Sequence, residues 1–222
     1  MARQEAFGFG DSTQPVRVLA QLQTLYPDAR YYLNFSSPLE LLVAAILSAQ
    51  VRDTVVNATT PALFRKYPTA AAYAGADLET LIKEISPVSF PGNKAKHIQQ
   101  ACAILVEKYQ GRVPDTVEQL VELPGIGRKT AVTILINAFG IVNGIAVDTY
   151  VIRVAYRLGW TKSKDPEKIE QDLMMIIPRE EWARVTWLLK AHGRAVCKAP
   201  SPLCGQCAIE PDCPKVSVAK RV

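Results

Sequence analysis

The sequence lacks any stretch that could cross a membrane. A helix that spans a bilayer needs about 20 apolar residues, whereas the longest apolar run here, residues 39–47, has nine residues and includes Glu40. The N-terminal residues also lack the apolar segment of a secretory signal. We therefore expect a cytoplasmic protein that has no membrane partner.

Strand signals are equally scarce. No segment shows a sustained alternation of apolar and polar residues, and there is no internal repeat, low-complexity tract or long run of one charge. Helical periodicity is clear instead in residues 78–85, 94–109, 128–139 and 149–158. Gly111, Gly140 and Gly159 are suited to end the last three of these helices. These patterns predict an all-α fold.

The helix that follows Ser37 has a complete start signal. Ser37 is a favourable N-cap, Pro38 suits the first helical position, and Glu40 can close a capping box. The residues from there to about Gln50 are apolar on nearly every face. This pattern predicts a helix that runs through a hydrophobic core.

Two further helix starts follow the same logic. Asp165 as an N-cap, with Pro166 at the first helical position, predicts a helix that runs to about Ile177. Asp115, with Glu118 three residues later, predicts another helix that ends before Pro124-Gly125.

The charge of the chain is compatible with an anionic partner but does not identify one. Lys and Arg number 26 against 21 Asp and Glu, which gives a net charge of +5. Such an excess suits nucleic acid, yet many soluble proteins carry as much and bind nothing acidic. The identity of the partner must therefore be inferred from sequence motifs.

The chain has five cysteines, of which one stands apart. Cys102 lies in an apolar helical stretch, which predicts burial as a small hydrophobic residue. The other four lie within 17 residues in the pattern C-x6-C-x2-C-x5-C and are Cys197, Cys204, Cys207 and Cys213. In a cytoplasmic protein such a group indicates a metal or cluster cofactor rather than disulfides. The single C-x2-C pair favours a [4Fe–4S] cluster over tetrahedral zinc, and zinc and free thiols remain alternatives on the residues alone.

Residues 123–131, Leu-Pro-Gly-Ile-Gly-Arg-Lys-Thr-Ala, join two predicted helices. Gly125 and Gly127 permit a turn whose backbone N–H groups face outward beside the positive end of the next helix, and this combination binds a phosphate. The alternative is a plain helix–helix turn. Arg128 and Lys129 favour the phosphate site, because cations at a helix start oppose the helix dipole and so point to a functional cause.

Three more residues have a structural and a functional interpretation. Asp148 is a good N-cap for the helix of residues 149–158. Gln50 stands at the end of the apolar helix, where an ordinary C-terminus would explain it. Phe90 is either a core residue or an exposed apolar side chain with a function.

The hairpin of residues 123–131 and the spacing of the four cysteines resemble those of the endonuclease III branch of the helix-hairpin-helix DNA glycosylases. Residues 147–151 (Val-Asp-Thr-Tyr-Val) and 47–50 (Leu-Ser-Ala-Gln) also match segments of that family. The resemblance covers roughly residues 30–215. It implies a [4Fe–4S] cluster that is held by the four cysteines and is mainly structural.

The resemblance also assigns roles to the candidate residues. Lys129 takes the position of the nucleophile, which attacks the sugar as a neutral amine; a helix N-terminus, neighbouring cations and partial desolvation would lower its pKa. Asp148 takes the position of the catalytic carboxylate. Gln50 would fill the space of an extruded base, and Phe90 would intercalate. The remaining predicted DNA contacts are Gly125, Gly127, Arg128, Tyr150, His192, Arg194 and Lys198.

The sequence departs from the usual pattern of the family in three places. Tyr150 stands where relatives usually have His. A tyrosine side chain ordinarily titrates near pH 10 and a histidine side chain near pH 6.5, so we expect a shifted lesion preference or rate. Ser89 and Pro91 flank Phe90 in place of the usual Gly and Tyr, which predicts a stiffer loop. Lys198 is the only basic residue between the first two clustered cysteines, where relatives often carry several, so we expect weaker and less salt-dependent binding.

The resemblance implies two helical domains with a DNA-binding cleft between them. A six-helix barrel domain with the helix-hairpin-helix would span residues 31–141. Residues 1–30 and 142–222 would form the [4Fe–4S] domain, with residues 1–15 as a loose tail. We expect a nucleoid-associated monomer that binds double-stranded DNA containing damaged bases or abasic sites.

The expected activity is removal of oxidised pyrimidines from duplex DNA, followed by β-elimination at the abasic site through a lysine Schiff base. One alternative is a mismatch-type glycosylase that only releases bases, against which Lys129 argues. Another is a DNA-binding iron–sulfur protein without catalytic activity.

Overall fold

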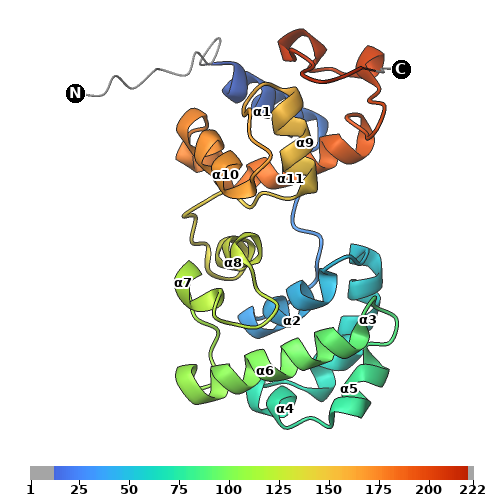
Figure 1. Ribbon diagram of the computed structural model, residues 1–222, viewed down its shortest axis with the longest axis vertical. Coiled ribbons are helices and arrows are strands. Elements are labelled where there is room, and N and C mark those ends of the chain that lie inside the picture. The colour runs from blue at the N-terminus through green and yellow to red at the C-terminus, as the bar shows by residue number, and fades with distance from the viewer. Residues whose placement is uncertain (1–12, 220–222) are drawn as a thin grey trace, which may run out of the picture. The chain divides into compact units, whose positions relative to one another are not determined.

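The computed structural model describes residues 13–219 (Figure 1). This part of the chain consists of helices, short helical turns and loops, and it contains no strand. None of its helices combines the length and the apolarity that a bilayer crossing requires. The all-α prediction is therefore confirmed over these residues.

The helices group into two compact units. One unit is a continuous segment, residues 31–141, and we call it the hairpin unit. The other combines residues 13–30 with residues 142–219, and we call it the cysteine unit.

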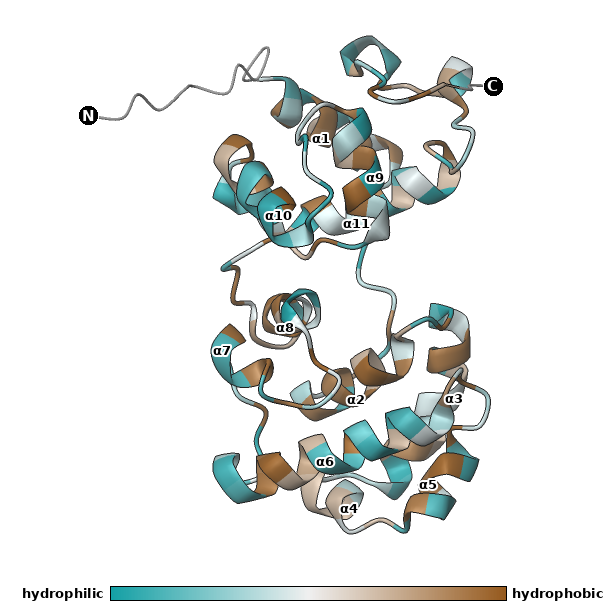
Figure 2. Cartoon of the chain, viewed as in Figure 1, coloured by the Kyte–Doolittle hydropathy of each residue, from teal (hydrophilic) through white to brown (hydrophobic). Residues whose placement is uncertain are grey.

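The hairpin unit is built around α2 (Pro38–Ser48), which packs against α3, α6 and α8. All seven residues from Leu41 to Leu47 are buried, which confirms the prediction of a helix that runs through a hydrophobic core. The hydropathy colouring of Figure 2 marks most of α2 as hydrophobic. The other elements of this unit are α3 (Asp53–Lys66), α4 (Ala70–Ala74), α5 (Leu78–Glu84), α6 (Pro91–Tyr109), α7 (Val117–Leu120), α8 (Arg128–Ile134) and a π-helical turn (Leu135–Phe139).

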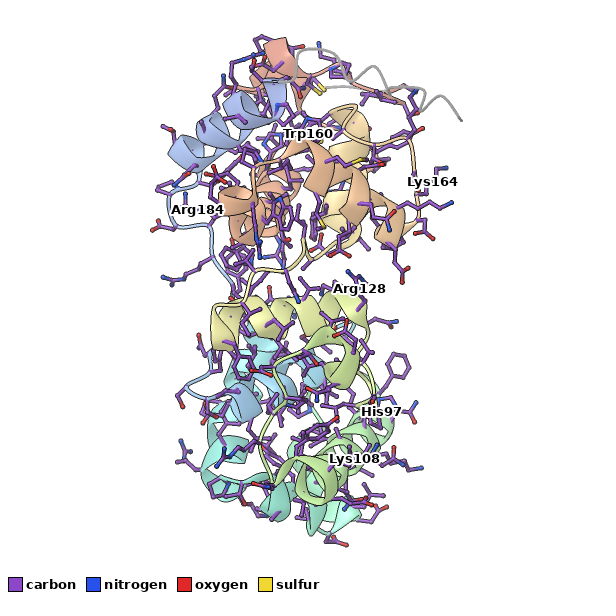
Figure 3. All side chains as sticks on the ribbon, turned by 90° about the vertical axis from the view of Figure 1, so that its left-hand side faces the viewer. His97, Lys108, Arg128, Trp160, Lys164 and Arg184 are labelled. Atoms are coloured by element: carbon purple, nitrogen blue, oxygen red, sulfur yellow. The ribbon has the colours of Figure 1, made fainter. Side chains whose placement is uncertain are left out.

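The cysteine unit contains α1 (Gln14–Leu25), α9 (Thr149–Arg157), α10 (Pro166–Ile176) and α11 (Trp182–Ala195). Short 3-10 turns cover Arg179–Glu181, Cys204–Gln206 and Glu210–Asp212. Helix α11 packs against both α9 and α1. Trp160, only 2% exposed, lies inside this unit (Figure 3) and donates from Nε1 to Gln14 Oε1 at 2.6 Å. This bond ties the start of α1 to the core of the unit.

Two of the predicted helix starts are confirmed. The Ser37 hydroxyl accepts from the Glu40 N–H, and Asp165 Oδ1 accepts from the N–H groups of Glu167 and Lys168. The capping box differs in one respect: the Glu40 carboxylate accepts from the N–H and hydroxyl of Ser36 at 2.6 and 2.7 Å. Ser36 offers two donors, whereas the backbone of Ser37 offers one.

The prediction of an Asp115 helix start is wrong by one residue. Thr116 is the N-cap, and its hydroxyl accepts from the Gln119 N–H at 3.4 Å. The helix ends at Leu120, earlier than predicted. The residues before Pro124 then form a turn, because a proline disfavours helical geometry in the residue before it.

The helix predicted for residues 128–139 changes character at Leu135, where it becomes a π-helical turn. Two side chains bond to backbone carbonyls near this point: Thr133 Oγ1 donates to the Lys129 carbonyl and Asn137 Nδ2 donates to the Thr133 carbonyl. Such bonds compete with the regular helical ladder.

The predicted glycine stops are confirmed, because Gly111, Gly140 and Gly159 all have positive φ. The predicted loose tail of residues 1–15 is wrong for Gln14 and Pro15, which begin α1. Residues 1–12 lie outside the described residues.

Substitution of Asp165 by Ala should lower the free energy of unfolding by about 1 kcal/mol, because α10 loses its capping acceptor. Urea denaturation followed by circular dichroism measures this change. Asp165→Asn is the matched control and should stay close to wild type, since asparagine caps as well as aspartate. Equal losses in both variants would contradict the assignment of the cap.

Candidate functional site

The hairpin turn between α7 and α8 uses its two glycines in different ways. Gly125 has φ +84°, and a Cβ at this position would lie 3.1 Å from Nδ1 of His97 on α6. Gly127 is the N-cap of α8 with φ −96°, and a Cβ there would meet no atom within 4 Å. The first glycine is therefore required by the fold. The second leaves open space beside the start of α8.

Arg128 and Lys129 occupy the first turn of α8, and both are exposed (Figure 3 labels Arg128). The two side chains and the open face of Gly127 form one surface, which we call the hairpin surface. Two cations beside a helix N-terminus suit an anionic ligand.

Asp148 caps α9, as predicted. Its Oδ1 accepts from the N–H groups of Tyr150 and Val151 at 2.8 and 2.9 Å. Both of these bonds go to one carboxylate oxygen, so the cap leaves Oδ2 for another ligand. The capping and catalytic interpretations are therefore compatible.

Tyr150 packs closely against α11. A Cβ on Gly193 would lie 2.8 Å from Cδ1 of the Tyr150 ring, so only glycine permits this approach. The guanidinium groups of Arg153 and Arg194 lie 5.0 and 5.5 Å from the ring centroid. Cation–π attraction of this kind stabilises an aromatic ring beside two positive charges.

Gln50 and Phe90 lie on two neighbouring loops of the hairpin unit. Both side chains are exposed, Phe90 by 62%, which excludes the alternative that Phe90 is a core residue. Both residues have positive φ, 57° and 56°, which is uncommon for residues other than glycine. Ser89 Oγ lies 3.5 Å from the Gln50 carbonyl oxygen and so links the loops.

The four clustered cysteines line a single pocket of the cysteine unit, together with apolar side chains that include Val154, Leu158 and Ile209. Arg157 Nη1 lies 3.3 Å from both the Sγ and the carbonyl oxygen of Cys197. Burial raises the pKa of the Cys207 thiol to about 11. A cationic cofactor would favour the thiolate form that burial disfavours.

The chain matches the model of the HhH-GPD superfamily base excision DNA repair proteins over residues 43–179. It is 47% identical to endonuclease III of Synechocystis sp., over 91% of this chain and 92% of that protein. It is 39% identical to endonuclease III of Escherichia coli, over 89% of this chain and 93% of that protein. The chain belongs to the endonuclease III family.

Solved structures agree with this membership. A trapped endonuclease III–DNA covalent intermediate is similar with a TM-score of 0.87 and 41% identity, over 93% of this chain and 97% of that one. A thermostable thymine-DNA glycosylase shares the fold with a TM-score of 0.82 at 18% identity, over 91% and 96%. The predicted resemblance to endonuclease III is thus confirmed.

One residue that the endonuclease III resemblance assigned to DNA contact is buried. His192 is only 2% exposed, with Nδ1 3.2 Å from Tyr26 Oη and Nε2 3.7 Å from Cys207 Sγ. Burial also lowers the pKa of its imidazole to about 4, so the ring is neutral near pH 7. The predicted DNA contact of His192 is therefore wrong, and the residue supports the cysteine pocket instead. Arg194 and Lys198 are exposed.

Two residues near these sites were not singled out from the sequence. Lys94 on α6 is buried and bonds to the end of α2, and Tyr26 from α1 contacts His192. A signal for Lys94 was present, because Lys94, Ile98 and Leu105 share the apolar stripe of their helix. No local pattern could have paired Tyr26 with a residue so distant in the chain.

Replacement of Gly125 by Ala should lower the free energy of unfolding by about 1 kcal/mol or more, because of its positive φ and the approach of His97. Gly127→Ala is the comparison and should lower that free energy by less, because this N-cap has neither a positive φ nor a neighbour within 4 Å of the added Cβ. Urea denaturation midpoints compare the two variants. A loss that is equal in both would show that the hairpin turn differs from the one described.

Proposed function

We propose that the chain removes oxidised pyrimidines from duplex DNA and then cleaves the strand at the resulting abasic site. The observation that carries this proposal is the exposed Lys129 on the first turn of α8, directly after the glycine hairpin, in a member of the endonuclease III family. A glycosylase that only releases bases needs no amine at this position.

The hairpin surface would bind the DNA backbone. The N–H groups at the start of α8 carry the positive end of the helix dipole, and Arg128 adds a full charge beside them. A phosphate can approach the backbone closely at Gly127, where a Cβ would meet none of the described atoms within 4 Å. This contact would position the damaged strand without reading its sequence.

Lys129 would act as the nucleophile. Its neutral amine forms a bond to the sugar C1′, and the damaged base leaves with the electron pair of the glycosidic bond. Opening of the sugar ring then gives a Schiff base, and loss of a C2′ proton expels the 3′ phosphate. A relative that is 41% identical has been trapped as a covalent intermediate with DNA, which supports this chemistry.

Asp148 would assist this step from α9. Oδ1 is engaged by two backbone N–H groups, which fix the orientation of the carboxylate. Oδ2 can then stabilise the positive charge that develops on the sugar or accept a proton from the attacking amine.

Gln50 and Phe90 would form a wedge that holds the duplex open around an extruded nucleotide. Their exposed side chains on adjacent loops suit this role, in which an amide fills the vacated space and an aromatic ring enters the stack. Tyr150, Arg194 and Lys198 would contribute contacts from the cysteine unit. The two arginines at the Tyr150 ring favour an anionic strand beside it.

The four cysteines would hold a [4Fe–4S] cluster. The donor set fits, since four thiols line one largely apolar pocket. The contribution of the cluster would be to fix the loops of residues 197–213.

Borohydride trapping tests the lyase chemistry. Wild-type protein on a duplex with an oxidised pyrimidine should form a covalent DNA adduct, because borohydride reduces the Schiff base to a stable amine. Lys129→Gln should form none, as seen by denaturing gel electrophoresis. Arg128→Gln, which removes the neighbouring charge, is the matched control and should still form the adduct at a higher protein concentration. Absence of a wild-type adduct, on that duplex and on an abasic one, would contradict the proposal.

Metal analysis tests the cofactor. Protein purified without oxygen should contain iron and acid-labile sulfide in equal amounts and absorb broadly in the visible range. Cys207→Ala should lose most of both, because one thiolate ligand is gone. Cys102→Ala is the control, since that thiol is buried in the hairpin unit, and its iron content should not change. Zinc in place of iron would overturn the assignment.

A further inference from the structure

The turn that follows α2 adopts a backbone conformation that its residues do not favour. The Ser48 carbonyl accepts from the Val51 N–H at 3.1 Å, Ala49 has φ −58° and ψ 114°, and Gln50 has φ 57°. These values describe a type II turn with Gln50 at the third position, where glycine or asparagine is usual. A glutamine held there is strained, and such a conformation persists only where its surroundings enforce it.

Lys94 provides a contact that enforces it. The side chain of Lys94 leaves α6 and is only 5% exposed, yet its Nζ donates to the carbonyl oxygens of Leu47 and Ala49 at 2.8 and 2.7 Å. These carbonyls belong to the C-terminal end of α2, where the helix dipole is negative. The buried ammonium therefore satisfies backbone acceptors that the end of the helix leaves open.

The bond to Ala49 selects the type of turn. Type I and type II turns differ in the orientation of the central peptide, which here is the peptide between Ala49 and Gln50. Lys94 holds the carbonyl of that peptide in the type II orientation. Rotation to type I would break this bond and would move Gln50 to a negative φ, which a glutamine adopts without strain.

Phe90 lies at the start of the helix that carries Lys94. The backbone N–H of Lys94 makes the ordinary first helical bond of α6, to the Phe90 carbonyl at 3.2 Å. Phe90 precedes Pro91 and has φ 56° and ψ 51°, so it too is held in an uncommon conformation. Ser89 Oγ, 3.5 Å from the Gln50 carbonyl oxygen, links this loop to the turn that Lys94 holds.

We propose that Lys94 is a positioning residue that sets the backbone at Gln50, and so the Gln50–Phe90 wedge, before DNA binds. This inference rests on the proposed function, in which the wedge fills the duplex around an extruded nucleotide. A wedge that is already in place does not have to be ordered during binding, which lowers the cost of nucleotide extrusion. Lys94 itself does not touch the reacting atoms.

A crystal structure of Lys94→Met tests the backbone directly and does not depend on activity. Without the ammonium, the peptide between Ala49 and Gln50 should rotate and Gln50 should take a negative φ. The matched control is Lys108→Met, which removes the same charge from an exposed position further along α6 (Figure 3) and should leave the turn unchanged. If Gln50 keeps a positive φ in Lys94→Met, the inference is overturned.

Single-turnover kinetics test the consequence for function. On an intact duplex with an oxidised pyrimidine, Lys94→Met should react on the order of tenfold more slowly than wild type, since the strained turn is no longer selected. On an abasic site opposite a one-nucleotide gap, where no wedge is needed, its lyase rate should match that of wild type. Equal losses on both substrates would mean that Lys94 has only a structural role, and this would overturn the inference.

A double-mutant cycle separates positioning from direct contact. If Lys94 acts through the wedge, adding Lys94→Met to a protein that already carries Gln50→Ala and Phe90→Ala should not lower its rate on the intact duplex any further. A further loss would overturn the inference. Should Lys94→Met fail to fold, Lys94→Leu, which also has no donor for the two carbonyls, replaces it in all three measurements. Wild-type protein that is inactive on both substrates would contradict the proposed function, whereas the crystal structure would still decide the role of Lys94.

Discussion

The complete burial of α2 is the constraint on which the hairpin unit depends. A helix whose residues 41–47 are all buried requires neighbours on every side, and α3, α6 and α8 supply them. A buried helix end also requires donors for its last carbonyls, and Lys94 from α6 supplies two. The exposed Gln50 follows directly, so the chain reaches the proposed wedge where its most deeply buried helix ends.

Features that depend on residues close in the chain were predictable. Asp148 and Asp165 act as N-caps, since a cap bonds to N–H groups only two or three positions later. The prediction that Asp115 is an N-cap failed because the adjacent Thr116 caps a helix nearly as well. The local sequence does not distinguish between these two neighbouring residues. The predictions of the hairpin, the four-cysteine site and the family used the spacing of residues along the chain. This spacing can be read directly from a single sequence.

Features that depend on packing were not predictable. His192 is a polar residue with a basic neighbour in the sequence, which suggested an exposed position. It is instead buried against Tyr26, which lies 166 positions away. Lys94 shares the apolar stripe of α6, but lysine is rarely buried, and only the end of α2 explains its place. The close approach of Tyr150 to Gly193 likewise joins two helices that are distant in sequence. Each case requires a partner that no local pattern names.

The cysteine unit is closed by bonds between the two ends of the described chain. Gln14 Nε2 donates to the Asp212 carbonyl across 198 positions, and Arg17 forms an ion pair with the Asp212 carboxylate. During synthesis, at about 5–20 residues per second, α1 is made long before its partner Asp212. The continuous hairpin unit can fold in the interval of roughly ten seconds or more that separates them. Until then the apolar face of α1, which includes Val18 and Leu22, has no core to enter.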